Sequence, residues 1–349
     1  MIHISYHHDL KEVQGDPVLA DVMTAHARSP FDRLEWWQGL EAECALRPMI
    51  AVARGGGDVA ILPLQQGEGH LRALANWYNF TIRPVLNQSI APERATALIA
   101  AIARDLRRRA WRVTLAPLPD EALGDGVLAA AFAQAGWIVK REQCDVNRYD
   151  ALSHYANYAE FLAARPGTLR TTLKRKSRKV ICMIHEQFSD DVWDEYETVY
   201  RASWKPEEGS FGFLRRFARQ EAAAGRLRLG IARHEGSPVA AQLWTIDHGT
   251  AFIHKLAHVE ASKALSAGTT LSAALFEHVI DIDRASAVDF GTGDAAYKRD
   301  WMQGVRPRYR LDLFDPRNPR AWPHLVRDRL RGRDRIRGRE SLVSSASAG

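Results

Sequence analysis

Two segments of the chain share one alternation of apolar and polar positions. MIAVARGGGDVAILPL (residues 49–64) and LGIARHEGSPVAAQLW (residues 229–244) each contain an apolar run ending in Ala-Arg, a turn with glycine, and a second apolar run opening with Val-Ala. Short apolar runs joined by a glycine-containing turn are typical of β-hairpins. Each segment therefore predicts a hairpin, and the pair indicates a weak internal repeat, with chance similarity of two amphipathic hairpins as the alternative.

The elements predicted after each hairpin follow the same order. A strand-rich segment, a helix and a strand are predicted for residues 70–86, 93–109 and 111–118 in the first copy, and for residues 250–260, 269–284 and 287–293 in the second. In the second helix, apolar residues at helical spacing form one face, with members Leu271, Ala274, Leu275, Val279 and Ile282. Two such units predict an α/β fold with two similar tandem domains, each with a sheet flanked by helices.

Length and composition set the domain limits. The chain has 349 residues, of which 46% are hydrophobic and 26% are charged, as in ordinary soluble globular proteins with two domains. We expect an N-terminal domain over residues 1–150, a basic linker region over residues 151–185 with a long helix from about 155, and a C-terminal domain over residues 186–320. We expect residues 321–349 to form a basic, disordered tail.

The net charge of +6 is distributed unevenly. Residues 165–179 (RPGTLRTTLKRKSRK) carry seven Lys or Arg and no acid, and residues 323–349 carry seven Arg against three acids. The rest of the chain is therefore mildly acidic, which excludes a uniformly basic nucleic-acid-binding protein.

Several chain-wide signals point to a cytoplasmic protein without a transmembrane segment. The N-terminus lacks the basic start and apolar core of a secretory signal, and no apolar stretch approaches 18 residues. Cys44, Cys144 and Cys182 are widely spaced and odd in number, which favours reduced thiols. His254 and His258 would lie about 13 Å apart on a strand, so we expect no metal site.

The junction KALSAGTTL (residues 263–271) lies where a predicted strand gives way to the second predicted helix. A helix N-terminus presents backbone N–H groups without intrahelical partners and a partial positive charge, so it can bind a phosphate where side chains are small. The alternative is a plain helix cap, in which Ser266 or Thr269 satisfies the backbone.

The order of hairpin, strand, loop, helix and the strand DFGTGDAAYKRDWM resembles the C-terminal half of the GNAT (GCN5-related N-acetyltransferase) superfamily. More narrowly, the chain is similar to tandem-domain, Fem-like acyltransferases associated with exopolysaccharide, cellulose or cell-envelope synthesis. The resemblance covers roughly residues 30–315, and its strongest piece is Asp289-Phe-Gly-x-Gly-Asp294-x-x-Tyr297-Lys298 with Trp301. It implies two tandem GNAT-like domains, each a mixed, mostly antiparallel sheet flanked by helices, of which the first is degenerate.

The resemblance implies acetyl-CoA or another acyl-CoA as co-substrate, bound by the second domain. The strand before the loop would splay from its neighbour and offer its backbone to the pantetheine, while the loop holds the pyrophosphate. The implied cofactor-binding residues are Leu256, Ala257, His258, Lys263, Ser266, Ala267, Gly268, Thr269 and Thr270. The first domain is not expected to bind acyl-CoA, because Pro92 at its helix start has no N–H to offer.

The reaction needs a base for the attacking amine and an acid for the leaving thiolate. Glu260 is the first candidate base, Asp289 and Asp294 are alternatives, and Tyr297 resembles the GNAT tyrosine that acts as the acid. A packing role for Tyr297 and a helix cap at Asp294 are the plain alternatives. The candidate acceptor-site residues are Trp77, Tyr78, Asp294 and Lys298, with core packing as the alternative for Trp77 and a solvated side chain for Lys298.

We therefore expect an N-acyltransferase that acts on an amine of a small metabolite or envelope precursor, in the cytoplasm or at the inner face of the membrane. The alternatives are an aminoacyl-tRNA-dependent Fem-like transferase and a catalytically silent binding module. The basic stretch 165–179 predicts either a solvated helix face or an electrostatic funnel for CoA phosphates, an anionic acceptor or tRNA.

Overall fold

The computed structural model describes residues 1–87, 90–120 and 125–326, so the predicted tail beyond residue 326 lies outside the described residues. The strands are β1 (His3–His7), β2 (Pro48–Gly55), β3 (Asp58–Gln65), β4 (His70–Ala73), β5 (Val85–Leu86), β6 (Arg112–Pro119), β7 (Ile138–Ala151), β8 (Ile181–His185), β9 (Leu227–His234), β10 (Ser237–Asp247), β11 (Thr250–His258), β12 (Ala287–Thr292) and β13 (Val305–Phe314). The α-helices are α1 (Leu10–Gly15), α2 (Pro17–His26), α3 (Leu34–Cys44), α4 (Pro92–Leu106), α5 (Asp125–Gln134), α6 (Tyr158–Ala163), α7 (Gly167–Lys176), α8 (Asp190–Arg201), α9 (Phe211–Ala223), α10 (Ala267–Glu277) and α11 (Ala296–Trp301). The short helices are η1 (Pro30–Asp32), η2 (Ser177–Lys179), η3 (Glu260–Leu265), the π-helical turn η4 (His278–Ile282) and η5 (Pro319–Ala321).

The predicted internal repeat is confirmed. The two hairpins are β2–β3 and β9–β10, both antiparallel. In each half a third strand, a helix and a parallel fourth strand follow, namely β4, α4 and β6 in the first half and β11, α10 and β12 in the second. The α/β class and the mostly antiparallel sheet flanked by helices are therefore as predicted.

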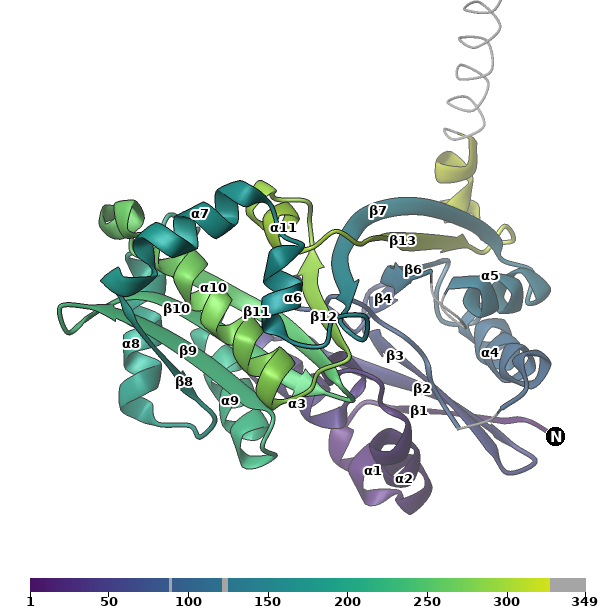
Figure 1. The fold of residues 1–349 in the computed structure, drawn as a ribbon. Coiled ribbons are helices and arrows are strands. Elements are labelled where there is room, and N and C mark those ends of the chain that lie inside the picture. Colours follow the sequence, from purple (N-terminus) through teal and green to yellow (C-terminus); the bar gives the residue numbers. More distant parts are fainter. Residues whose placement is uncertain (88–89, 121–124, 327–349) are drawn as a thin grey trace, which may run out of the picture.

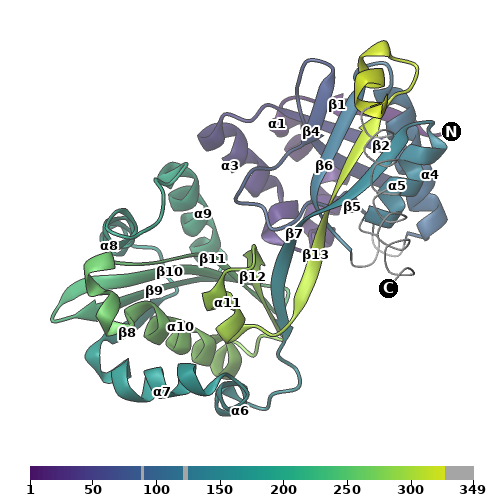
Figure 2. The same ribbon diagram turned by 90° about the horizontal axis from the view of Figure 1, so that it is seen from above.

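The two halves share a single sheet with the strand order β1-β2-β3-β4-β6-β13-β7-β12-β11-β10-β9-β8. The last strand of each half lies beside the other half: β13 pairs with β6, and β7 pairs with β12. β13 also pairs with β7 along the whole length of β13, and Figure 2 shows the two strands running side by side from one half to the other. Residues 305–314, predicted within the C-terminal domain, thus complete the first half.

The prediction of one long helix over residues 155–185 is wrong. Pro166 separates two short helices, α6 and α7, because the residue before a proline is disfavoured in the helical conformation. The apolar run Ile181–His185 forms β8, which pairs with β9 at the edge of the sheet. A short run of apolar residues does not distinguish a strand from a helix by its periodicity, and here the free edge of β9 decides.

Three hydrophobic clusters hold the sheet and its helices together (Figure 1). The first half buries α4 and α5 against one face of its strands, and the second half buries α10, α6 and α7 in the same way. A third cluster joins the halves, and in it α3 of the first half packs against α9 of the second. In its centre the ring of Trp36 meets Phe213 and Phe217 edge-on, at centroid distances of 4.9 and 5.0 Å. Among the described residues, no helix is both long enough and apolar enough to cross a bilayer.

Candidate active site

The parallel strands β11 and β12 separate beyond their first three residue pairs. Thr250–Phe252 pair with Ala287–Asp289, and from Ile253 onward the described residues of β11 and β12 form no further pairs. On its other side β11 has a bulge against β10, where the register shifts so that His254 is the extra residue. A bulge re-aims a strand, and the unpaired edge leaves backbone groups that an extended ligand can bind. The splay expected from the resemblance is present.

The N-terminus of α10 lies beside this open edge and is not capped by a side chain. Ser266 precedes the helix in the left-handed conformation, with φ of 55°, which is uncommon for a residue other than glycine. In the described part of the chain the amides of Ala267, Gly268 and Thr269 donate to no acceptor. The cap expected as the alternative is thus absent, and these amides are free to bind an anion.

A pocket of about 240 Å³, here the outer pocket, opens in front of this helix start. Its walls come from β11, η3, α10, α11 and the segment after α8, and consist of Trp204, Leu256, His258, Lys263, Ser266, Ala267, Gly268, Thr269, Ser272, Tyr297 and Trp301. Seven of the nine predicted cofactor-binding residues line it. The exceptions are Ala257, which faces the hydrophobic core, and Thr270, whose side chain bonds back to the Ser266 carbonyl.

Two cations lie at the outer pocket, and the sequence identified only one of them as a site residue. Lys263 is exposed and pairs with Glu260 at 3.3 Å. Lys176 comes from α7, and its Nζ donates to the Ser266 hydroxyl at 3.1 Å. Lys176 was one of seven cations in the basic stretch 165–179, and nothing in its local spacing distinguished it from the others.

A second pocket of about 220 Å³, here the inner pocket, adjoins the outer one. Leu256 and Tyr297 line both pockets, so they mark the place where the two meet. The inner pocket is walled mainly by aromatic rings and lysines, among them Trp36, Trp77, Tyr78, Phe80, Phe217, Phe290, His254, Lys205, Lys255 and Lys298. Three of the predicted acceptor-site residues, Trp77, Tyr78 and Lys298, therefore lie together.

Trp77 and Tyr78 from the first half and His254 from β11 of the second half differ in how they line this pocket. Trp77 is 66% exposed, so the expected alternative of core packing does not hold for it. Tyr78 is buried, and its hydroxyl donates to Glu208 at 2.6 Å. His254 is half-buried, and its Nε2 lies 2.8 Å from the Thr245 hydroxyl. Burial, with Arg33 and Lys255 nearby, lowers the pKa of His254 to about 3, so its ring is neutral.

Tyr297 projects from the first turn of α11 at the junction of the two pockets. Its side chain is 38% exposed, its ring meets Phe290 edge-on, and its hydroxyl bonds to no other described residue. Burial raises the pKa of Tyr297, so the phenol carries its proton at neutral pH. A free, protonated hydroxyl at this place is able to donate a proton to a leaving group.

The predicted carboxylates are not brought into either pocket. Asp289 is 5% exposed, accepts from Asn147 and the Gly291 amide, and pairs with Arg306 at 2.9 Å. Glu260 lies on η3 with its side chain half exposed, outside both linings. Among the described residues, neither pocket is lined by Asp or Glu.

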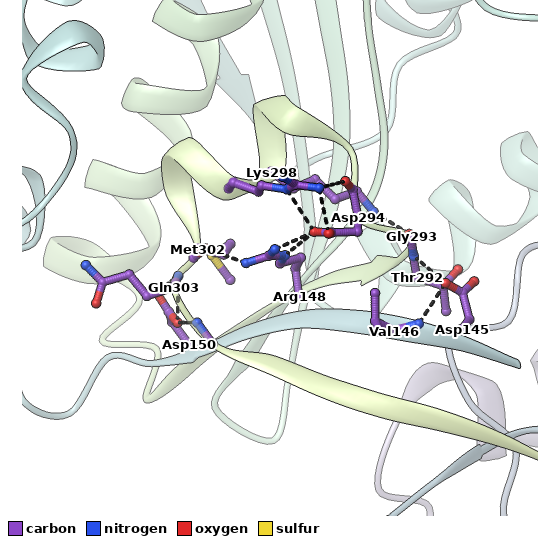
Figure 3. Close-up of polar contacts among 12 residues, drawn as sticks. Asp145, Val146, Arg148, Asp150, Thr292, Gly293, Asp294, Lys298, Met302 and Gln303 are labelled. Atoms are coloured by element: carbon purple, nitrogen blue, oxygen red, sulfur yellow. Dashed lines mark hydrogen bonds and ion pairs between the residues drawn. The ribbon is translucent and has the colours of Figure 1, made fainter. Parts of the chain in front are cut away.

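Asp294 lies in the turn between β12 and α11, where Arg148 from β7 points at it (Figure 3). Arg299 pairs with its other oxygen at 2.7 Å, and the hydrogen bond from Arg148 is the main reason that the pKa of Asp294 is lowered. The residue that caps α11 is Ala295, so the expected capping role of Asp294 is wrong. Asp294 instead fixes the start of α11, and hence Tyr297, to the strand β7.

The described residues contain no group of His, Cys, Asp or Glu that could hold a metal ion. Residues 167–299 match the family described as Acetyltransferase (GNAT) domain. This range includes β11, α10 and Tyr297, which form walls of the outer pocket. A search of the curated proteins finds no match.

Solved structures share the fold over most of the chain. FemX has a TM-score of 0.61 at 9% identity, covering 89% of this chain and 96% of its own. The C-terminal domain of a putative lysylphosphatidylglycerol synthetase from Agrobacterium fabrum has a TM-score of 0.58 at 14% identity, covering 92% and 96%. A tandem GNAT protein from the clavulanic acid biosynthesis pathway has a TM-score of 0.53 at 15% identity, covering 89% and 98%. Residues 167–299 therefore match a GNAT acetyltransferase domain, and the chain as a whole shares its tandem fold with these solved structures.

Proposed function

We propose that the chain moves an acetyl or other acyl group from acyl-CoA to the amine of a small metabolite or an envelope or exopolysaccharide precursor, in the cytoplasm. One observation carries this proposal: the uncapped start of α10 faces the outer pocket beside the unpaired edge of β11. A pyrophosphate fits free helix amides, and pantetheine amides fit a free strand edge.

In this proposal the outer pocket holds the donor and the inner pocket holds the acceptor. The thioester lies where the pockets meet, at Leu256 and Tyr297. The amine nitrogen attacks the thioester carbonyl, the carbon–sulfur bond breaks, and Tyr297 gives its proton to the thiolate. Because no Asp or Glu lines the pockets within the described ranges, the proton of the amine leaves through water.

Calorimetry with acetyl-CoA tests the donor site. We expect saturable binding that Lys176→Met weakens about tenfold, because a charge-assisted contact at the pyrophosphate is lost. Lys174→Met is the matched control, since Lys174 is exposed on the same helix and is not hydrogen-bonded to Ser266. No saturation with any CoA thioester would contradict the proposal.

A second candidate donor is aminoacyl-tRNA. The fold shared with FemX motivates it, and so do the exposed cations of α7 and η2, namely Arg170, Lys174, Arg175, Arg178 and Lys179. Filter binding to tRNA separates the two donors. If the donor is aminoacyl-tRNA, the affinity for tRNA should fall steeply with salt and be lost when Lys174, Arg175 and Arg178 are changed to Glu. In that case the native chain should not bind acetyl-CoA.

A further inference from the structure

Three ammonium groups line the inner pocket. Lys298 from α11 is 8% exposed, and its Nζ donates to the Thr292 carbonyl. Lys255 from β11 pairs with Glu208 at 2.8 Å. Lys205, from the segment after α8, forms no ion pair with a described carboxylate. Three cations thus converge from three different elements on a pocket of about 220 Å³.

The negative charge nearby does not balance them. Glu208 provides one carboxylate, which it shares between Lys255 and the Tyr78 hydroxyl. The next carboxylates are Asp289, which is already paired with Arg306, and Asp145, which accepts from the Val146 and Gly293 amides. Like charges held together away from water disfavour the charged form, and the lysines show this cost. Burial is the largest cause that lowers the pKa of Lys205 and brings the pKa of Lys298 to about 8. Lys255 adds to the lowering at Lys205, and Lys205 adds to it at Lys298, where Asp289 and Asp145 act in the opposite direction.

The remaining wall of the inner pocket consists mainly of aromatic rings, with His254 and Thr292 as polar members. The rings of Trp36, Phe80, Phe217 and Phe290 face it. A pocket of this size takes a small molecule, and an aromatic wall takes an apolar body. A ligand that complements the whole pocket therefore combines a small apolar body with one negative group at the lysine end.

Resting on the proposed function, we propose that the acceptor is a small amine that also carries a carboxylate. Lys205 and Lys298 bind the carboxylate in the inner pocket, and the amine lies at the Leu256–Tyr297 end, beside the thioester. Charge-assisted hydrogen bonds between ammonium and carboxylate groups are stronger than neutral ones. A bound carboxylate would also reduce the repulsion among the three lysines.

Matched probes that differ only in the anionic group test this proposal. The pairs are 4-(aminomethyl)benzoate with 4-(aminomethyl)benzamide, and 6-aminohexanoate with 6-aminohexanamide. Titration calorimetry on the full chain is expected to show that, in at least one pair, the acid binds about tenfold more tightly than the amide. Lys205→Met and Lys298→Met should each reduce that ratio towards one, whereas Lys11→Met, an exposed change on α1, should leave it unchanged.

The outcomes separate this proposal from the proposed function. Equal affinities for acid and amide, or no binding of any probe, would overturn the proposal that the acceptor carries a carboxylate. Saturable binding of acetyl-CoA would still support the proposed acyl transfer. If the chain prefers the acids clearly but does not bind acetyl-CoA, the proposal that acyl-CoA is the donor is contradicted instead. If Lys298→Met fails to fold because its side chain is buried, Lys205→Met carries the test, since Lys205 is only partly buried.

Discussion

Tyr297 and Leu256 are the side chains that both pockets share, and only Tyr297 has a polar group to offer there. Replacing it with phenylalanine keeps the ring against Phe290 and removes the hydroxyl. We expect Tyr297→Phe to lower kcat about 10²-fold, because the thiolate loses its proton donor, with the affinity for acetyl-CoA unchanged. Thiol-release kinetics and calorimetry measure the two quantities. Tyr158→Phe, on α6, is the control, and an unchanged kcat for Tyr297→Phe would remove the residue from the chemistry.

Lys298 makes the binding of an acidic acceptor depend on pH. The groups that face it are Asp289 and Asp145, which favour its charge, and Lys205 and Arg148, which oppose it together with burial. Because its pKa is lowered to about 8, the side chain is charged below pH 8 and loses its charge above it. The affinity for the acid probes should therefore fall between pH 7 and pH 9 relative to the amides. Calorimetry across this range should show the fall in the native chain and not in Lys298→Met.

At this scale the sequence predicted the lining of the outer pocket better than its surroundings. The small residues before α10 and the Asp-Phe-Gly motif led to the loop and to Tyr297. Lys176 was missed because a run of cations does not show which one turns towards the pocket, and Lys205 was missed because no local pattern distinguishes it in RASWKPEEGS. Asp289 was an alternative candidate base, and the sequence did not show that Asn147 on β7 and Arg306 on β13 already bind its carboxylate.

Gly291, near the end of β12, lines the inner pocket next to Phe80. Gly291 has φ of 67°, and a Cβ there would lie 2.8 Å from the ring of Phe80. Gly57, in the β2–β3 turn, also has a positive φ but has open space around it. We expect Gly57→Ala to cost about 1 kcal/mol for the conformation alone, and Gly291→Ala to cost about 1–3 kcal/mol more because Phe80 must move. Thermal and urea unfolding measure both, and equal costs would show that the Phe80 contact is unimportant.

Strands and helices within each repeat could be predicted because their periodicity is local. The two hairpins, α4 and α10 lie where the apolar patterns place them. The linker could not be predicted in the same way, since β8 is a strand only because β9 offers it an edge. The widening between β11 and β12 followed from the family resemblance and not from any pattern in their residues.

At the scale of the whole molecule, the crossed pairing of β7 and β13 ties the halves together. Truncation after residue 304 would remove β13 and leave β6 and β7 without the strand between them. We expect the truncated chain to lose the cooperative unfolding of both halves, and the intact chain to unfold in one calorimetric transition. Truncation after residue 326, which keeps β13, is the control. A folded first half in the shorter chain would contradict the expectation.

The repeat of two similar halves was predictable from sequence, whereas their joining into one sheet was not. Pairing between strands separated by more than 150 residues depends on edges that no local pattern describes, such as that between Arg112–Pro119 and Val305–Phe314. The shared cluster of Trp36, Phe213 and Phe217 arises in the same way.

The position of β13 also bears on how the chain is made. Translation completes β6 at residue 119, but β13, one of the two strands that pair with β6, begins only at residue 305. At about 5–20 residues per second, the ribosome needs roughly 10 to 40 s to supply the missing strand. During that interval the nascent first half has an uncovered strand edge at β6, so its folding must wait for β13, or the edge must be protected until β13 has been synthesised.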